Sequence, residues 1–387
     1  MGAVEFKMFF DGTAATVDQL DKIDEITVDQ AIDRAWEARI KIPVCVNNDG
    51  KWEGENEAWM KAYSRIRVEV NAGDGNFVPL IDGPVVGFDS ARSAQPGKSV
   101  VTVVVHDDSA LLNREAKVEV RQGMSDSEIA EQIFTDAQLG GAPQIDPTPP
   151  QPNQTTNAAV RRGTPMQFLR DLARRNQDWH AYVLPGALPS QSIGCFKQFP
   201  TDTDGLPDMS MMGADRNIEN FNVNNRASSP TSVQAATLSL DHSGVQTATS
   251  SYRDATLLGD QPPDSTNTNQ STTLLPPGQS DRVDLNRAVT GAAALSGFAL
   301  DATGNIVPFC YPAALYPYRW VMVKISDSQF STKYLITQVK HTLTRSVYTQ
   351  NFSMKGNAVS AGAATSASTP QPSASASASF NVQVSIF

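Results

Sequence analysis

The stretch that most constrains the fold of this chain covers residues 160–184. Thr164 is a suitable N-cap, Pro165 takes the first helical position, where no N–H is needed, and Gln167 completes a capping box. These signals predict a helix over residues 164–176, followed by a short strand. Four apolar residues recur on one face of this helix: Phe168, Leu169, Leu172 and Ala173. Because the opposite face is basic, we expect the apolar face to pack against a sheet.

A second helix of the same kind is predicted over residues 125–137. Ser125 and Glu128 form its capping box, and its apolar stripe consists of Ile129, Ile133 and Phe134. The connector between the two helices, residues 140–157, contains five prolines and is expected to be extended. The predicted order is therefore helix, proline-rich connector, helix and strand.

The rest of the sequence is rich in alternating apolar and polar residues, the pattern of half-buried strands. Residues 1–113 are predicted to form an all-β domain, and residues 334–343 and 346–354 a hairpin. Turns are predicted at residues 82–84 and 301–305, where glycine stands beside other turn-forming residues. The predicted fold class is therefore mainly β with some α (α+β).

Several short phrases occur in the order found in one known family. The two helices and the following strand carry Ser125, Asp126 and Ile129, then Phe168, Leu169, Leu172 and Ala173, then Trp179 and Tyr182. The last hairpin carries Tyr334, Ile336, Val339 and His341, then Tyr348, Asn351 and Phe352. Looser matches precede them at Gly83, Val85, Val86, Asp107, Leu111 and Leu112. In these phrases the chain resembles the phage late-control D and baseplate-hub proteins, which are related to the N-terminal part of the VgrG proteins of type VI secretion.

The resemblance implies two similar small β-barrel "tube" domains with a helical insertion, assembled as a trimeric ring of pseudo-sixfold symmetry. On this interpretation the chain divides into a first barrel at 1–113, the insertion at 114–205, a second barrel at 206–355 that carries an inserted loop and helix at about 256–300, and a tether with a strand-like end at 356–387.

The same resemblance implies a structural baseplate hub that joins a sixfold inner tube to a trimeric spike. The implied partners are two further copies of the chain, a spike protein, an inner tube protein and baseplate wedge proteins, in the baseplate of a phage virion or injection particle. No catalytic, cofactor-binding or metal-binding residue is expected. Two other functions stay open, a tail-associated cell-wall hydrolase and a β-rich glycan-binding adhesin. A hydrolase would need a pair of acidic groups, for which Asp107 with Asp108, or Asp178 beside His180, are the candidates.

Composition excludes several classes of protein. The formal charge of −10 and the pI near 4.9 argue against a nucleic-acid-binding face, which is normally basic. Cys45, Cys195 and Cys310 are too scattered to predict a disulfide framework or a zinc site. No apolar run approaches the roughly 20 residues of a membrane span. The first residues lack the basic start and apolar core of a secretory signal, so none is expected.

The segment after Lys355 has an unusual composition. Residues 356–387 contain no charged residue, and the Ala/Ser-rich part is typical of a tether. The last eight residues, 380–387, alternate apolar and polar side chains, with Phe380, Val382, Val384 and Ile386 on one face. Two hypotheses stay open for them. They are either a frayed tail or a strand that binds a partner by adding to the sheet edge of a neighbouring protein.

Overall fold

Strands predominate over helices in the computed structural model, which confirms the predicted fold class, mainly β with some α. The structure describes residues 5–54, 57–73, 75–95, 97–148, 158–176, 179–198, 205–226, 231–239, 244–263, 271–275 and 285–361.

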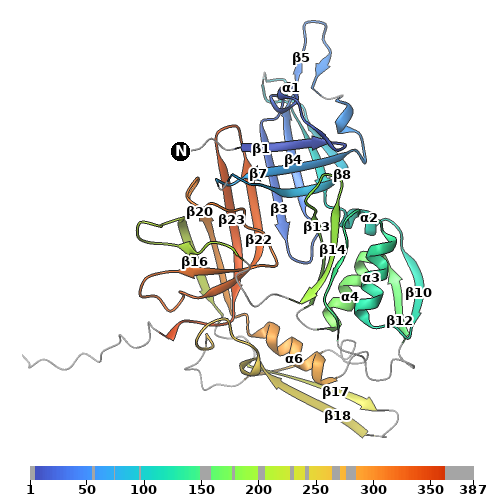
Figure 1. Ribbon diagram of the computed structural model, residues 1–387, viewed down its shortest axis with the longest axis vertical. Coiled ribbons are helices and arrows are strands. Elements are labelled where there is room, and N and C mark those ends of the chain that lie inside the picture. The colour runs from blue at the N-terminus through green and yellow to red at the C-terminus, as the bar shows by residue number, and fades with distance from the viewer. Residues whose placement is uncertain are drawn as a thin grey trace, which may run out of the picture.

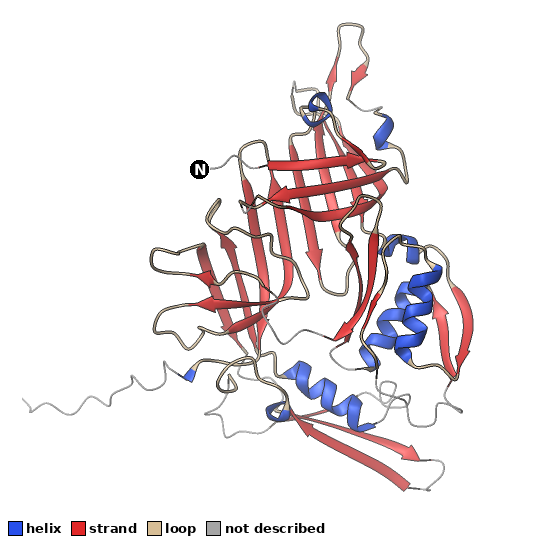
Figure 2. Ribbon diagram, viewed as in Figure 1, coloured by secondary structure: helices blue, strands red, loops and turns tan. Residues whose placement is uncertain are grey.

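The largest sheet has thirteen strands, with the path β16-β20-β23-β22-β3-β4-β9-β8-β7-β1-β2 (Figures 1 and 2). Two further strands lie off this path, since β21 pairs with β22 and with β15. The strands are β1 (Glu5–Phe10), β2 (Thr13–Ala14), β3 (Glu25–Ala31), β4 (Glu37–Pro43), β7 (Arg65–Asn71), β8 (Phe77–Ala91), β9 (Val100–His106), β15 (Met209–Ser210), β16 (Ile218–Asn225), β20 (Leu300–Ile306), β21 (Trp320–Lys324), β22 (Lys333–Leu343) and β23 (Tyr348–Gly356).

The sheet is continuous because β3, from the N-terminal part of the chain, pairs antiparallel with β22, from the C-terminal part. The register runs from Ile26 opposite Leu343 to Ala31 opposite Gln338. On either side of this pair the same sheet encloses a separate apolar core. The N-terminal strands and the C-terminal strands of this sheet are thus joined edge to edge by backbone hydrogen bonds.

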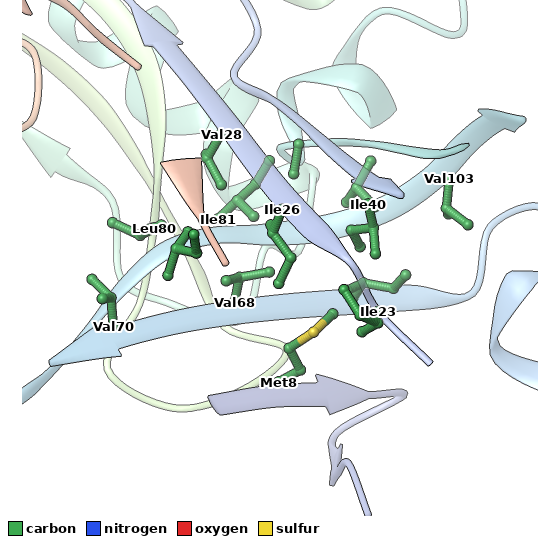
Figure 3. Packing of buried hydrophobic residues seen from close by; sticks show 14 of the residues in the cluster. Met8, Ile23, Ile26, Val28, Ile40, Val68, Val70, Leu80, Ile81 and Val103 are labelled. Atoms are coloured by element: carbon green, nitrogen blue, oxygen red, sulfur yellow. The ribbon is translucent and has the colours of Figure 1, made fainter. Parts of the chain in front are cut away.

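The first core is built from alternating residues of the N-terminal strands, whose β-branched side chains suit a pleated, half-buried surface. Figure 3 shows this packing, with Ile26, Val28, Ile40 and Val68 facing one another. Tyr318, Leu343 and Tyr348 belong to the same cluster, so the C-terminal part of the chain completes the N-terminal core. The short elements of this part of the chain are α1 (Val17–Leu20), β5 (Cys45–Val46), β6 (Trp52–Glu53) and η1 (Ala58–Met60), of which η1 contributes Trp59 and Met60 to the core.

An α+β insertion follows β9. It comprises α2 (Ser109–Leu112), β10 (Lys117–Gln122), α3 (Asp126–Asp136), β11 (Gln144–Ile145), β12 (Ala158–Gly163), α4 (Pro165–Arg175), β13 (Trp179–Pro185) and β14 (Ser192–Gln198). Both predicted helices and both predicted capping boxes are confirmed. In Figure 1 the two helices lie between the sheet β11-β14-β13 and the ribbon β10-β12. Their apolar faces form a third core with Trp179 and Phe196, so α4 packs against a sheet as expected.

The cap of α4 gives a direct test of this local structure. Thr164 Oγ1 accepts a hydrogen bond from the Gln167 N–H at 3.3 Å and donates one to Asn113 Oδ1 at 2.9 Å. We expect Thr164→Ala to lower the free energy of unfolding by about 1 kcal/mol. The control is Thr16→Ala, which removes the same capping box from α1, a helix with no buried residue, and should have a smaller effect. Urea unfolding of both variants checks this, and equal losses would contradict it.

A second excursion leaves the sheet between β16 and β20. Asn225 at the end of β16 pairs with Leu300 at the start of β20, and the described strands between them form a separate sheet. The excursion forms β17 (Ser232–Ser239), β18 (Gly244–Ser251), η2 (Tyr252–Asp254), β19 (Thr272–Leu274) and α6 (Leu285–Ser296). One face of this small sheet packs on α6 through a fourth core. The excursion is therefore longer than the 256–300 expected from the sequence.

Two predicted turns are wrong, and both contain a glycine that the sheet needs for close contact. Gly83 lies within β8, which pairs with β7 up to Pro84 and with β9 from Val85 onward. A Cβ on Gly83 would lie 1.9 Å from the His106 carbonyl oxygen. Gly304 lies within β20, where a Cβ would lie 2.2 Å from the Asn220 carbonyl oxygen. In both places glycine permits backbones to approach within a strand.

Candidate functional site

Two of the acidic residues considered for a hydrolase, Asp107 and Asp108, are engaged within the protein. Asp107 is buried, and its Oδ1 and Oδ2 accept hydrogen bonds from the N–H groups of Ser109 at 2.9 Å and Trp36 at 2.7 Å. Burial raises the pKa of Asp107 to about 6. Asp108 is also buried and binds an arginine, while Asp178 lies outside the described residues. Asp107 and Asp108 therefore hold the backbone and a neighbouring strand together, and offer no exposed acid–base pair.

Buried polar contacts instead gather where the parts of the chain meet, and the largest set joins β7 to the insertion. The guanidinium of Arg65 donates to Asp82 Oδ1 at 2.6 Å and to both carboxylate oxygens of Asp108, at 3.0 and 2.7 Å. It also donates to the Ser192 hydroxyl at 3.1 Å, at the start of β14. Bidentate binding of a carboxylate by arginine fixes the relative orientation of the two side chains as well as their distance. Arg65 therefore orients β14 relative to the first core.

Arg67, two residues along the same strand, holds the β13–β14 turn. Its side chain is 2% exposed and donates to Glu69 at 2.7 Å and Asp82 at 3.1 Å. Nη1, which binds Asp82, also donates to the carbonyls of Gly186 at 2.8 Å and Leu188 at 3.1 Å, and Nη2 donates to that of Ala187 at 3.1 Å. Asp82 is fully buried, and this burial raises its pKa even though two arginines face it. Arg65, Arg67, Asp82 and Asp108 are called the arginine clamp below.

An aromatic junction brings three parts of the chain together. Asp33, between β3 and β4, donates its N–H to the Tyr318 hydroxyl at 2.8 Å and accepts from His180 Nδ1 at 3.0 Å. The rings of Tyr182 and Tyr318 stack with centroids 3.7 Å apart. Burial alone would raise the pKa of Asp33, but the hydrogen bond and charge of His180 lower it below its usual value. His180 is thus paired with Asp33 and fixes β13 of the insertion against both β-rich parts.

A buried chain of hydrogen bonds crosses the β3–β22 junction. Gln30 Nε2 donates to the Leu80 carbonyl at 2.7 Å, which leaves Gln30 Oε1 as the acceptor for His341 Nε2 at 3.2 Å. The neutral ring then accepts from the Tyr348 hydroxyl at Nδ1, at 2.8 Å. In this order each of the three contacts joins one donor to one acceptor. Burial lowers the pKa of His341 to about 3, so the ring is neutral at physiological pH.

The His341 network predicts a loss of stability in acid. The pKa of His341 is about 3 in the folded chain and about 6.5 in the unfolded chain. The unfolded chain therefore binds the extra proton between these values, and stability falls by about 1.4 kcal/mol per pH unit as pH drops from about 6 to 3. We expect His341→Gln to flatten this part of the dependence. Urea unfolding at pH 7, 5 and 4 measures it, and equal slopes for both proteins would contradict the assignment.

Other kinds of site are not formed in the part of the chain that the structure describes. No group of three or more His, Cys, Asp or Glu residues there could hold a metal ion. No helix there is long and apolar enough to cross a membrane. The three cysteines are free thiols, Cys195 buried and the other two exposed. The predicted partner-binding residues Phe380, Val382, Val384 and Ile386 lie outside the described residues.

His341 and Tyr348 belong to the phrase by which the last hairpin resembles the hub family, whereas the sequence did not predict either arginine of the clamp. The sequence did carry a signal for the clamp, because the charged residues Arg65, Arg67 and Glu69 alternate with the apolar residues Ile66, Val68 and Val70. Charged residues on the second face of a strand are ordinarily solvated. Here that face is covered by the insertion.

Solved structures of other proteins share the fold of this chain. The prophage MuSo2 43 kDa tail protein from Shewanella oneidensis superposes with a TM-score of 0.62 at 12% identity, over 92% of this chain and 99% of its own. A tail protein from Neisseria meningitidis gives 0.58 at 12% identity, over 92% and 97%. This chain has the fold of these tail proteins.

The tail-protein fold extends to one secretion component. An Escherichia coli protein of the type VI secretion system, described as similar to the bacteriophage T4 tail proteins gp27 and gp5, superposes with a TM-score of 0.52 at 11% identity, over 90% of this chain and 76% of its own. No protein-family model and no curated protein matches the sequence. The similarity to these proteins is therefore a similarity of fold, at 11–12% sequence identity.

Proposed function

We propose that this protein is a structural baseplate hub of a contractile phage tail or injection system, which joins a sixfold inner tube to a trimeric spike. The observation that carries the proposal is the tail-protein fold over 92% of the chain, together with nearly the whole length of two tail proteins. The type VI relative, with its stated likeness to gp27 and gp5, supports the finer assignment to the late-control D and VgrG-like hubs.

The internal construction suits a part that transmits force. The β3–β22 pair makes one continuous sheet that contributes to both β-rich cores. The arginine clamp and the aromatic junction hold the insertion against this sheet. Such connections resist relative motion of the parts, because moving them would expose buried charges and backbone groups. We infer that three copies form a ring in which two barrel-like units per chain present six similar surfaces to the tube. A spike protein and baseplate wedge proteins would be the other partners, in a virion or injection particle.

The protein would act by assembly alone, without a chemical step. The test is light scattering of the purified protein, alone and with the tube and spike proteins encoded beside it. We expect a particle of three times the 41.7 kDa chain mass, either directly or when the spike is added. A protein that stays monomeric and binds neither the tube nor the spike protein would contradict the proposal. Hydrolysis of peptidoglycan by the protein, lost on Asp178→Asn while the variant keeps the stability of the unmodified protein, would establish the hydrolase in its place.

A further inference from the structure

The large sheet ends at β16, which has a free edge as far as the described residues show. Among the described residues β16 pairs only with β20, and its other edge carries no strand. Its sequence IENFNVNN has neither proline nor lysine and only one charged residue, Glu219. Free edges normally carry such residues, or are covered, because they recruit other strands. At the opposite end of the path, by contrast, β2 covers part of β1, at Phe9 and Phe10.

The two faces of β16 differ in chemistry. Phe221 and Val223 are half-buried at the rim of the second core, where the Phe221 ring meets that of Tyr334 at 5.6 Å and that of Phe352 at 6.2 Å. Asn222 and Asn224 alternate with them and are exposed. A strand laid along this edge would therefore complete the core only if its own side chains alternate, apolar on one face and uncharged polar on the other.

Residues 380–387 have this chemistry and the same length of eight residues. Phe380, Val382, Val384 and Ile386 alternate with polar, uncharged Asn381, Gln383 and Ser385. With Phe380 opposite Asn225 in an antiparallel register, Val382 meets Val223 and Val384 meets Phe221. The same register sets Gln383 opposite Asn222, so amides face amides on the outer side.

The connection to this segment starts beside the edge. Gly356 at the end of β23 pairs with Leu300, which pairs with Asn225, so the ends of β23 and β16 lie about 10 Å apart, two strand spacings. The Ala361 N–H donates to Asp260 Oδ2 at 2.8 Å, and three residues further Pro263 accepts from the Asn225 side chain at 3.3 Å. A spacer of eighteen residues, 362–379, extends to about 60 Å, several times the distance required.

We propose that residues 380–387 bind the free edge of β16 in the same chain as an antiparallel strand. The direction follows from the topology, because β23 and β16 both run toward the end at which the connection begins. The added strand covers Phe221 and Val223 and satisfies the outward backbone groups of β16. It also withholds this edge from the strands of other chains. The proposal concerns the isolated protein and does not depend on the proposed function.

Hydrogen exchange followed by mass spectrometry tests the pairing. We expect peptides covering β16 to exchange at least about tenfold more slowly in the full chain than in a chain that stops at residue 379, because edge pairing protects amides. Val382→Ser combined with Val384→Ser should lose the protection, whereas the matched outer-face change Gln383→Ser should keep it. Peptides covering β1 serve as the internal reference. Equal exchange of β16 in the full and shortened chains would overturn the proposal.

A cross-link identifies the chain that supplies the strand. Asn222→Cys and Gln383→Cys, introduced after Cys45, Cys195 and Cys310 are changed to serine, would lie opposite each other within disulfide distance. We expect a disulfide within one chain, formed at low protein concentration and without tube or spike proteins. A disulfide that forms only between chains would show that a second copy supplies the strand and would overturn the assignment to the same chain. Absence of any disulfide, with unprotected β16, would remove the edge as a binding site.

Discussion

Arg67→Met is expected to lower the free energy of unfolding by about 3–5 kcal/mol, the typical loss when one partner of a buried ion pair is removed. Methionine keeps much of the side-chain volume but none of the N–H groups. The carboxylates of Glu69 and Asp82 then lose a donor in a dry junction, and three carbonyls of the β13–β14 turn lose theirs. Urea unfolding followed by tryptophan fluorescence measures the loss. Faster proteolysis near residues 186–191 should accompany it.

The matched control is Arg39→Met on β4. Arg39 also pairs with two carboxylates, Glu37 at 2.7 Å and Asp89 at 3.0 Å, but its side chain is 48% exposed. Exposed ion pairs contribute about 0–1 kcal/mol, so little change is expected. If both variants lost the same amount, burial would not be the source of the stability of the arginine clamp.

Tyr318→Ala is expected to have an effect of similar size, about 3–5 kcal/mol, because it removes a large buried aromatic side chain. The ring packs on Tyr182 and His180, and the hydroxyl accepts from the Asp33 N–H. One substitution therefore removes contacts among all three parts of the chain. We expect the unfolding transition to broaden or split as the insertion separates from the sheet, which calorimetry can detect.

Tyr318→Phe separates the two contributions of this residue. It keeps the stacked ring and removes the hydroxyl that accepts from the Asp33 N–H, so about 1–2 kcal/mol is expected. A loss equal to that of the alanine variant would mean that the ring contributes little. No loss in either variant would mean that the aromatic junction does not hold the parts together.

Local signals predicted the helices well, because capping is decided within a few residues. Thr164 and Ser125 each cap a helix that begins at the next residue, as the sequence indicated. Strands also followed from alternation, as in β7 and β22. What could not be predicted is which strands pair. Nothing near β3 indicates β22 as its neighbour, because the partners meet only in the complete fold.

The same limit explains the errors at glycine and the missing clamp. Gly83 and Gly304 look like turn residues, yet each is required by a backbone from a distant segment. Arg67 contacts carbonyls about 120 residues away, at Gly186, Ala187 and Leu188. A single sequence shows that charged residues alternate with apolar ones in a strand such as β7. It does not show which segment covers the charged residues.

The late closure of the first core has a consequence for synthesis. Gln30 and His341 are 311 residues apart in the chain, although they share a hydrogen bond. At a translation rate of about 5–20 residues per second, about 15–60 s pass between the synthesis of β3 and the synthesis of its partner strand β22. During that interval the edge and apolar face of β3 are open to the nascent chains of neighbouring ribosomes. The yield of this protein in cells is therefore set by how well β3 is shielded while translation continues, and slower translation should reduce it.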